Sequence, residues 1–339
     1  MMFYATSLSR GVFHGTSRIA ITSGKRRLTN KVSQTTKRAQ VMCCRSFGTC
    51  IERDDSILLE SEDEGILTLT LNRPDQRNAL NRALLVKLKE VLTNLKNNPD
   101  DMNIRAVVIQ ANGQAFCSGH DLKELLSNCQ SHSVKEKNRI LFELCSEVMM
   151  LCRAVPQPTI AAVHGVATAA GCQLACSTDL TIASGHSSFG VTGVNVGLFC
   201  STPAVPLIRA IPKKIALDML FTGRILSAQE ALQFGLVSRV ISQGTTNFQI
   251  EKSDGHASFH NESSAVKEEA KNIAQLIASR SGYAIQTGKK ALYEQAGSSS
   301  MEMAYEKASE TMIKALESED ALCGIHSFLM KQTPEWKDK

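Results

Sequence analysis

Short, nearly apolar segments alternate with amphipathic segments along the middle of the chain. AVVIQ (106–110) and TIAAVH (159–164) have the length and composition of strands that are buried on both faces. A loop of small residues follows each of them, and helical periodicity follows each loop. This alternation predicts α/β architecture in which helices cover the strands.

Two segments closer to the N-terminus extend the same scheme. ILTLTL (66–71) alternates apolar residues with Thr, as a half-buried strand does, and 81–96 repeats Leu and Val at helical spacing. Asp121 and Glu124 have the spacing of a capping pair for a helix that begins at Leu122. Strands and helices are therefore expected to alternate from residue 66 onward.

Three regions follow from these patterns. Residues 55–242 carry the strands and helices and form the predicted α/β core. Residues 243–264 are polar, rich in Gly, Ser and Asn and aperiodic, so we interpret them as a surface loop or linker. Residues 265–339 show helical periodicity without strands, which predicts an all-helical region that could pack on a neighbouring subunit.

The first 50 residues differ in composition from the rest of the chain. They contain nine Lys or Arg and no Asp or Glu, and they are rich in Ser and Thr. This composition is typical of an organelle transit peptide and predicts a protein of the mitochondrial matrix; a basic arm that stays attached is the alternative. Without them the chain has 29 basic and 33 acidic residues, which removes the case for nucleic-acid binding.

Two missing patterns narrow the class of protein further. The eleven cysteines show no paired Cys-x-x-Cys spacing, so neither a zinc site nor a disulfide framework is predicted. No apolar run approaches the roughly 20 residues that a transmembrane helix needs. We therefore expect no metal and no membrane span.

Two loops share one design, in which a buried strand ends in small residues and the chain turns at once into a helix. They are AFCSGHDLKE (115–124) and GVATAAGCQLA (165–175). If the two strands are neighbours, the N–H groups of His120 and Ala170 can point at one spot, which is the geometry of an oxyanion hole. Each such donor is commonly worth about 3 kcal/mol in a transition state.

Five stretches of the chain carry a resemblance to a known family. They are NRPDQRNAL (72–80), AFCSGHDLKE (115–124), PTIAAVHGVATAAGCQLACSTDL (158–180), FTGRILSAQEALQFGLV (221–237) and GIHSFLMKQTPEW (324–336). In these stretches the chain resembles the crotonase family, the enoyl-CoA hydratases and isomerases. The resemblance implies a spiral of ββα units and a C-terminal helical region involved in trimerisation, with trimers or hexamers as the homo-oligomer. It implies an acyl-CoA ligand, with coenzyme A as part of that ligand and no permanently bound cofactor.

The resemblance also assigns roles to single residues. The family's oxyanion donors fall on the backbone amides of His120 and Ala170. Its contacts with the coenzyme A thioester fall on Ala79, Leu80, His120, Asp121, Leu122, Lys123, Phe328 and Lys331. A cation at Lys123 opposes the helix dipole unless it meets an anion such as a phosphate, although an ordinary solvated lysine remains open. Phe328 and Lys331 are expected on one face of the last helix, and a core Phe beside a surface Lys remains the alternative.

The chain departs from the family at the two positions that perform hydration. The family uses one glutamate to activate water and a second to deliver the α-proton, and Gln173 and Gly193 occupy these positions. A positioned acid or base is typically worth about 10² to 10⁴ in rate, so efficient hydration is not expected. FGVTGVNVG (189–197) is similar to the naphthoate synthase group, but Val191 stands where that group's bicarbonate-holding glutamine would be.

Other polar residues near these loops are weaker candidates for chemistry. His120 carries an imidazole suited to proton transfer, whereas His164 directly follows a buried strand and is interpreted as structural. The sequence identifies no partner base for Cys117 or Ser118 as a nucleophile. Gln173 can donate to a substrate oxygen or orient water, or it can pack in a pocket without chemistry.

Three functions remain open at this point. The first is a crotonase-family enzyme, a lyase, isomerase or hydrolase, that acts on an acyl-CoA through a polarised thioester or an enolate without the hydratase glutamates. The second is a non-catalytic acyl-CoA-binding regulator of fatty-acid metabolism. The third is a true enoyl-CoA hydratase.

Overall fold

The computed structural model describes residues 53–55, 57–99, 103–129, 134–241 and 255–339. The transit peptide predicted at 1–50 lies outside the described residues, and so does the first part of the predicted polar loop, 243–254.

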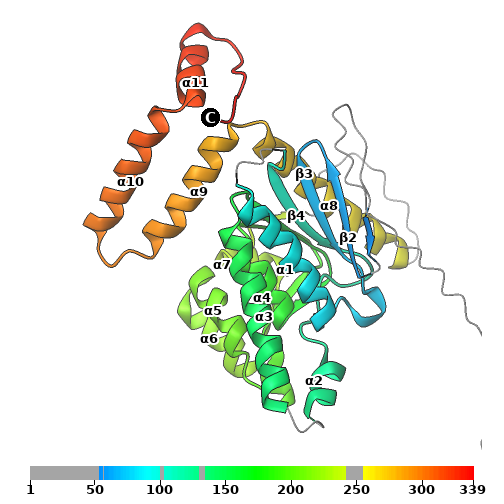
Figure 1. Ribbon diagram of the computed structural model, residues 1–339. Helices are drawn as coiled ribbons and strands as arrows, with labels where there is room; N and C mark the ends of the chain where they lie inside the picture. The colour runs from blue at the N-terminus through cyan, green and yellow to red at the C-terminus, as the bar shows by residue number, and fades with distance from the viewer. Residues whose placement is uncertain (1–52, 56, 100–102, 130–133, 242–254) are drawn as a thin grey trace, which may run out of the picture. The chain divides into compact units, whose positions relative to one another are not determined.

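A seven-stranded sheet forms the centre of the described chain (Figure 1). Its strands, in spatial order, are β1 (Arg53–Asp55), β2 (Leu58–Asp63), β3 (Ile66–Leu71), β4 (Ala106–Ala111), β5 (Thr159–Val163), β7 (Leu180–Ser184) and β10 (Arg239–Ile241). The pairs from β1 to β3 are antiparallel, and the pairs from β3 to β10 are parallel.

A second sheet of three strands accompanies the first. It contains β6 (Val166–Thr168), β8 (Ser188–Gly190) and β9 (Ile225–Ser227). Because β6 directly follows β5, and β8 directly follows β7, the chain passes repeatedly from the large sheet to the small one. This connectivity confirms the predicted α/β fold built from ββα units.

Helices enclose the sheets and follow one another along the C-terminal part of the chain as far as Met330. They are α1 (Arg82–Asn97), α2 (Leu122–Cys129), α3 (Val134–Ala154), α4 (Ala170–Ser177), α5 (Ser201–Ala210), α6 (Lys213–Thr222), α7 (Ala228–Phe234), α8 (Gly255–Ala278), α9 (Gly282–Ala296), α10 (Met301–Leu316) and α11 (Glu319–Met330), with the 3₁₀ turns η1 (Pro74–Gln76) and η2 (Thr192–Val196). Within the described part of the chain, no helix combines the length and the apolar character needed to cross a membrane.

The large sheet buries both of its faces because successive side chains of a strand point to opposite sides. On one face, Val108 and Ile160 pack against Val266 of α8. On the other face, Val107 belongs to a larger cluster that includes Leu88 of α1 and residues of α3. Burial on both faces explains why these strands are written as continuous apolar runs.

The predicted helix starts are largely confirmed. The Asn81 side chain caps α1 by accepting a hydrogen bond from the Leu84 amide at 3.0 Å. At α2, Asp121 accepts from the amides of the first turn, but Glu124 does not return a bond to Asp121. Its carboxylate instead accepts from the Arg82 amide at 3.0 Å, so only half of the expected capping pair is present.

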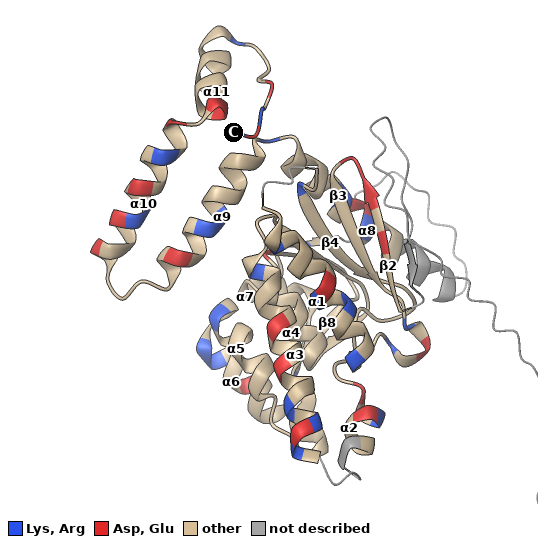
Figure 2. Cartoon of the chain, viewed as in Figure 1, with Lys and Arg blue, Asp and Glu red and all other residues tan. Residues whose placement is uncertain are grey.

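The C-terminal region is helical, as predicted, and α9 packs against α10. Acidic and basic side chains are interleaved along α10 (Figure 2). Helix α8 begins at Gly255 and therefore occupies the second part of the stretch 243–264 that was expected to be a loop. Once nucleated, a helix adds residues at low cost, and residues 255–264 contain no proline to stop it.

One predicted helix position is wrong. Helix α11 ends at Met330, and Lys331 is its C-cap, with a left-handed φ of 55°. This conformation takes Lys331 off the helical path, so it does not share a helix face with Phe328. The Phe328 side chain is 82% exposed, which also rules out the alternative of a core residue within the described chain.

A buried ion pair joins α9 to the core. The Lys289 ammonium lies 2.7 Å from the Asp179 carboxylate, and only 8% of the lysine side chain is exposed. The same ammonium donates to the carbonyl oxygen of Gln157 at 2.8 Å, and the Tyr293 hydroxyl donates to Asp179 at 2.6 Å. Burial, together with the bond to Asp179, raises the pKa of Tyr293 to about 12. These contacts hold α9 against the start of β5 and the end of α4.

Lys289→Ala is expected to lower the free energy of unfolding by about 3 kcal/mol, because Asp179 would stay buried without its cation. Urea unfolding followed by circular dichroism measures this loss. Lys271→Ala is the matched control, since the Lys271–Asp63 pair has side chains that are 43% and 48% exposed, and its loss should be below about 1 kcal/mol. Equal small losses in the two variants would contradict the role of Lys289 as an anchor.

Candidate functional site

Two parallel β-bridges bring the sequence motifs together. The first joins Cys117 to Ala167. The Cys117 amide donates to the Val166 carbonyl at 3.1 Å, and the Thr168 amide donates to the Cys117 carbonyl at 3.0 Å. The loop 115–124 therefore lies beside the strand that leads into α4.

The second bridge joins Leu80 to His120 and orients the His120 amide. The Leu80 amide donates to the Gly119 carbonyl at 2.7 Å, and the Asp121 amide donates to the Leu80 carbonyl at 3.1 Å. In a parallel bridge of this kind, the two bonds to Leu80 come from the residues on either side of His120, and His120 turns its own N–H to the opposite side. The His120 amide therefore points away from Leu80 and takes no part in the bridge.

The other predicted donor is the amide of Ala170, the first residue of α4. Amides of a first helical turn have no partner within the helix, and no side chain caps α4. The preceding residue, Ala169, has a φ of 48°, and its amide donates to the Gly190 carbonyl at 2.8 Å. The Ala170 amide thus stands at the positive end of the α4 dipole.

Two glycines allow the segments that carry these amides to touch. A Cβ on Gly119, which has a φ of +106°, would lie 2.9 Å from the Ala169 Cβ and 3.4 Å from the Ala170 nitrogen. A Cβ on Gly171 would lie 2.1 Å from the Cys117 carbonyl oxygen. The two predicted donors therefore belong to backbone segments in direct contact, and their binding of an oxyanion stays a prediction.

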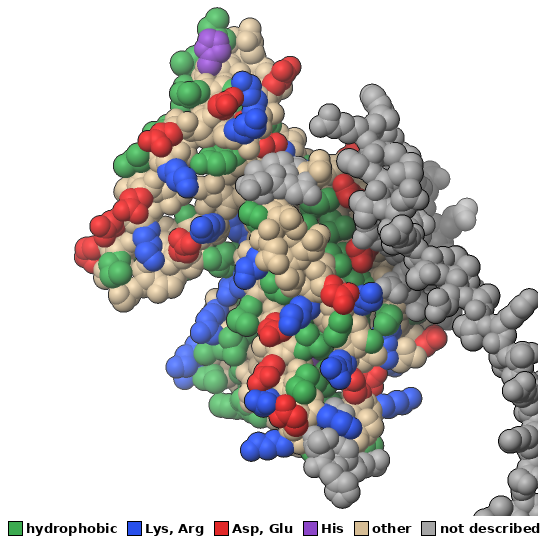
Figure 3. Space-filling model, in the orientation of Figure 1, with side chains coloured by type: hydrophobic (Ala, Val, Ile, Leu, Met, Phe, Trp, Pro, Cys, Tyr) green, Lys and Arg blue, Asp and Glu red, His purple; other side chains and the backbone are tan. Residues whose placement is uncertain are grey.

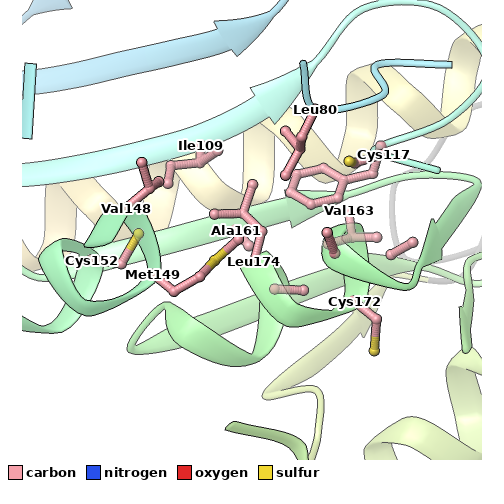
Figure 4. Packing of buried hydrophobic residues seen from close by; sticks show 14 of the residues in the cluster. Leu80, Ile109, Cys117, Val148, Met149, Cys152, Ala161, Val163, Cys172 and Leu174 are labelled. Atoms are coloured by element: carbon pink, nitrogen blue, oxygen red, sulfur yellow. The ribbon is translucent and has the colours of Figure 1, made fainter. Parts of the chain in front are cut away.

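A hydrophobic cluster supports this contact (Figure 4). Leu80, Cys117, Val163 and Leu174 are fully buried and belong to one cluster. Burial raises the pKa of Cys117 to about 12, so its thiol does not ionise at neutral pH. Because the thiolate is the nucleophilic form of cysteine, Cys117 serves as packing and not as a nucleophile.

Gln173 is the fourth residue of α4 and is almost completely buried, with 3% of the residue exposed. Its Oε1 has no hydrogen-bond partner among the described residues. Residues three and four positions apart share a helix face, so Gln173 shares a face with Ala169 and Ala170. A neutral amide at this position can accept or donate a hydrogen bond but cannot transfer a proton.

His120 is partly buried, and its two ring nitrogens are closed off from solvent. Neither nitrogen makes a hydrogen bond of ordinary geometry, but a contact with the Leu80 backbone works against the lowering of the ring's pKa. The ring meets the edge of Phe142 on α3, with 5.1 Å between the ring centroids. Burial lowers the pKa of His120 to about 4, so the imidazole is neutral at physiological pH and is a weak base.

Gly193, at the position of the family's second glutamate, has no charge and is surrounded by atoms that leave no space for a side chain. Gly193 lies in η2, and its amide donates to the Cys200 sulfur at 3.3 Å. A Cβ there would lie 2.6 Å from the Leu198 carbonyl oxygen and 2.8 Å from the Cys200 sulfur. The present backbone therefore has no room for any side chain at residue 193.

Arg73 and Asn78 fix the loop around Leu80. Both lie in the motif 72–80, but the sequence analysis assigned them no role. The Arg73 guanidinium pairs with the Asp121 carboxylate at 2.9 Å and also donates to the Ala79 carbonyl oxygen. The Asn78 amide donates to carbonyl oxygens of the loop that follows β4, at 2.7 and 2.8 Å. Partial burial works against ionisation of Asp121, but the bonds from Arg73 and the α2 amides hold its pKa below the ordinary value.

The residues predicted to contact coenzyme A differ widely in exposure. Ala79 and Leu80 are buried, and the Leu80 backbone is engaged by Gly119 and Asp121. Leu122 is 58% exposed, and Lys123 is also exposed on the first turn of α2. Asp121 is engaged by Arg73 and by the helix it caps. These contacts stay predictions.

The remaining candidates are structural. His164 is 1% exposed, and its Nε2 lies 2.8 Å from the Gly113 carbonyl oxygen, which agrees with the interpretation of a structural histidine. In the described part of the chain, no group of three or more His, Cys, Asp or Glu could hold a metal ion.

Comparison with known proteins gives consistent matches. The model of the enoyl-CoA hydratase/isomerase family matches residues 61–252. The chain is 40% identical over 285 residues to the mitochondrial enoyl-CoA hydratase domain-containing protein 3 of Rattus norvegicus, covering 84% of this chain and 86% of that protein. It is 32% identical to the 2,3-dehydroadipyl-CoA hydratase of Escherichia coli, and the match covers 84% of this chain and 100% of that protein.

Solved structures agree with the sequence matches. The crystal structure of human enoyl-CoA hydratase domain-containing protein 3 superposes with a TM-score of 0.71 at 39% identity, covering 83% of this chain and 100% of that chain. An enoyl-CoA hydratase from Mycobacterium smegmatis superposes with a TM-score of 0.72 at 40% identity, covering 83% of this chain and 98% of that chain.

The two buried histidines make stability depend on pH. Burial lowers the pKa of both His120 and His164 from 6.5 to about 4. Between these values the unfolded chain binds more protons, so the folded state should lose stability as the pH falls from 6.5 toward 4. The slope should reach up to about 1.4 kcal/mol per pH unit for each histidine. Urea unfolding at several pH values between 7 and about 5 measures it, before most carboxylates titrate.

His120→Phe is the test variant for this slope. The new ring can pack against Phe142 but cannot take up a proton, so about half of the pH dependence in this range should disappear. An unchanged slope in the variant would show that His120 does not titrate as its burial requires.

Proposed function

Because the chain belongs to the enoyl-CoA hydratase/isomerase family, we propose that it binds the thioester of an acyl-CoA at the backbone amides of His120 and Ala170. The observation that carries the proposal is the direct contact between the Gly119 turn and the start of α4. Two amides that converge on one carbonyl oxygen polarise it and stabilise an enolate oxygen. The uncapped end of α4 adds the positive end of a helix dipole.

Under this proposal, the protein does not hydrate enoyl-CoA thioesters efficiently. Hydration adds a hydroxyl to the β-carbon and a proton to the α-carbon, so it needs groups that activate water and deliver the proton. Gln173 and Gly193 provide neither. Because burial lowers the pKa of His120 to about 4, its neutral ring holds no proton to deliver to the α-carbon at neutral pH, and Cys117 keeps its proton.

The best-supported role is therefore an acyl-CoA thioester-binding protein of fatty-acid metabolism. The absence of a carboxylate at both Gln173 and Gly193 favours a non-catalytic, regulatory role. The paired amides favour the second candidate, an enzyme that forms an enolate from a thioester without the two hydratase glutamates. In either role coenzyme A is part of the ligand, and Lys123 is an exposed cation that could meet one of its phosphates.

Location and assembly follow from separate observations. Relatives are named mitochondrial proteins, which together with the basic N-terminal segment 1–50 supports a mitochondrial location, and we place the protein in the matrix. Helix α10 has no buried residue, and apolar side chains are exposed on the C-terminal helices (Figure 3). Such a surface supports a homo-oligomer, a trimer or hexamer.

Calorimetric titration tests the thioester site. The processed protein should bind acetoacetyl-CoA, whose enolate form suits the two amides, at least about tenfold more tightly than free coenzyme A. Gly119→Ala should abolish this difference, because a Cβ at residue 119 meets Ala169 at 2.9 Å. Gly235→Ala is the matched control, since Gly235 also has a positive φ, +85°, but its Cβ would have no neighbour closer than 3.8 Å. Equal affinity for both ligands in the unaltered protein would contradict the proposal.

Turnover of crotonyl-CoA tests the absence of hydration. The rate constant should lie below about 10⁻³ s⁻¹, roughly 10⁴ below a typical enzyme. The double variant Gln173→Glu with Gly193→Glu should remain inactive and be less stable, because residue 193 has no room for a side chain. Loss of the enoyl absorbance gives the rate, and ordinary enzyme turnover by the unaltered protein would restore the hydratase interpretation.

A further inference from the structure

Lys267 of α8 is a partly buried lysine that pairs with no carboxylate of the described residues. Helix α8 covers one face of the large sheet (Figure 1). The Lys267 Nζ lies 3.5 Å from Oδ1 of Asn112, at the long limit of a hydrogen bond. Within the described part of the chain, every other lysine that is at least partly buried lies beside a carboxylate. These pairs are Lys87 with Glu90, Lys89 with Glu147, Lys271 with Asp63 and Lys289 with Asp179.

The strands beneath Lys267 supply no acidic side chain. Helix α8 packs on β3, β4, β5, β7 and β10. The first four of these strands contain no charged residue, and Arg239 of β10 pairs with Glu269 of α8. The adjacent acid on α8, Glu268, is exposed. The burial of Lys267 is therefore not offset by an opposite charge from these elements.

Two neutral side chains face Lys267 beyond the carboxyl ends of β4 and β5. The Asn112 amide nitrogen donates to Oδ1 of Asn72 at 3.1 Å, which leaves the Asn112 Oδ1 for the lysine. His164 lies 2.8 Å, through its Nε2, from the carbonyl oxygen of Gly113, the neighbour of Asn112. Burial, together with the charge of Lys267, lowers the pKa of His164 to about 4, so this ring carries no charge at neutral pH.

These surroundings favour the free amine of Lys267 over its ammonium form. Partial burial removes water from the charge, and a buried ammonium group without an anion loses its proton more easily; the pKa of Lys267 is accordingly lowered. One turn further along α8, the bond from Lys271 to Asp63 raises the pKa of that lysine. The free amine is the nucleophilic form of lysine, so Lys267 is the more reactive of the two.

We propose that Lys267 is a site of acylation by acyl-CoA thioesters. The lone pair of its Nζ forms a bond to the thioester carbonyl carbon, the carbon–sulfur bond breaks, and its electron pair leaves with the sulfur. The proton released from the amine passes to that sulfur, so the products are free coenzyme A and an uncharged amide. This inference goes beyond the proposed function and does not rest on it, because the thioester can reach the partly exposed Lys267 from solution.

Mass spectrometry of the protein after incubation with acetyl-CoA at mildly alkaline pH tests the proposal. Lys271 is the matched internal control, because it lies on the same helix and is also partly buried. Lys267 should be acetylated about tenfold faster or more, since one unit of difference in pKa changes the fraction of free amine tenfold. In concentrated urea the two rates should be equal. A rate at Lys267 that is equal to or below the rate at Lys271 in the folded protein would overturn the proposal.

Two variants exchange the surroundings of the two lysines. Asn112→Asp gives Lys267 the carboxylate that it lacks, and a carboxylate within about 4 Å stabilises the ammonium form, so acetylation of Lys267 should slow about tenfold. Asp63→Asn removes the partner of Lys271 and should speed acetylation there without a change at Lys267. Thermal unfolding shows that each variant is folded. An unchanged rate at Lys267 in folded Asn112→Asp would contradict the inferred role of its surroundings.

The pH dependence of acetylation in the unaltered protein is a test that needs no variant. The rate at Lys267 should reach its maximum at a lower pH than the rate at Lys271, because its pKa is lowered while that of Lys271 is raised. Identical pH profiles would overturn the proposal. Failure of acetoacetyl-CoA to bind in the calorimetric titration would overturn the proposed thioester site and leave acylation of Lys267 standing.

Discussion

The close contact between two backbone turns is the constraint on which the site depends. Gly119 and Gly171 lie where a single Cβ would collide with the facing chain. Their contact brings together the backbone segments that contain His120 and Ala170 and ties the loop after β4 to α4. The Arg73–Asp121 pair and the buried Leu80 lie beside these segments and help to hold them.

The packing around these two turns also keeps two nearby titratable side chains neutral. Burial raises the pKa of Cys117 to about 12 and lowers the pKa of His120 to about 4, so both are neutral in the folded chain. Gln173 is neutral by composition, and Gly193 faces atoms that fill the place of a side chain. Neither of the two positions that carry glutamates in the hydratases thus has a carboxylate here.

The α/β architecture and the contact between the two turns could be predicted from the sequence, because both depend on local sequence patterns. Apolar runs marked strands buried on both faces, and small residues before helices marked the two turns. The sequence was insufficient where distant atoms decide the outcome. The crowding of Gly193 by Leu198 and Cys200 and the pairing of Arg73 with Asp121 depend on tertiary contacts. The left-handed cap at Lys331 shows the limit of extending helical spacing past an unmarked helix end.

The partly buried Asp179 carboxylate joins parts of the chain that are far apart in the sequence. It accepts hydrogen bonds from Thr159 at the start of β5 and from Tyr293 of α9, and it pairs with Lys289. One carboxylate therefore fixes the position of α9 relative to β5 and to the segment behind α4. The exposed apolar side chains of the C-terminal helices are thus held relative to the central sheet in part by this polar junction.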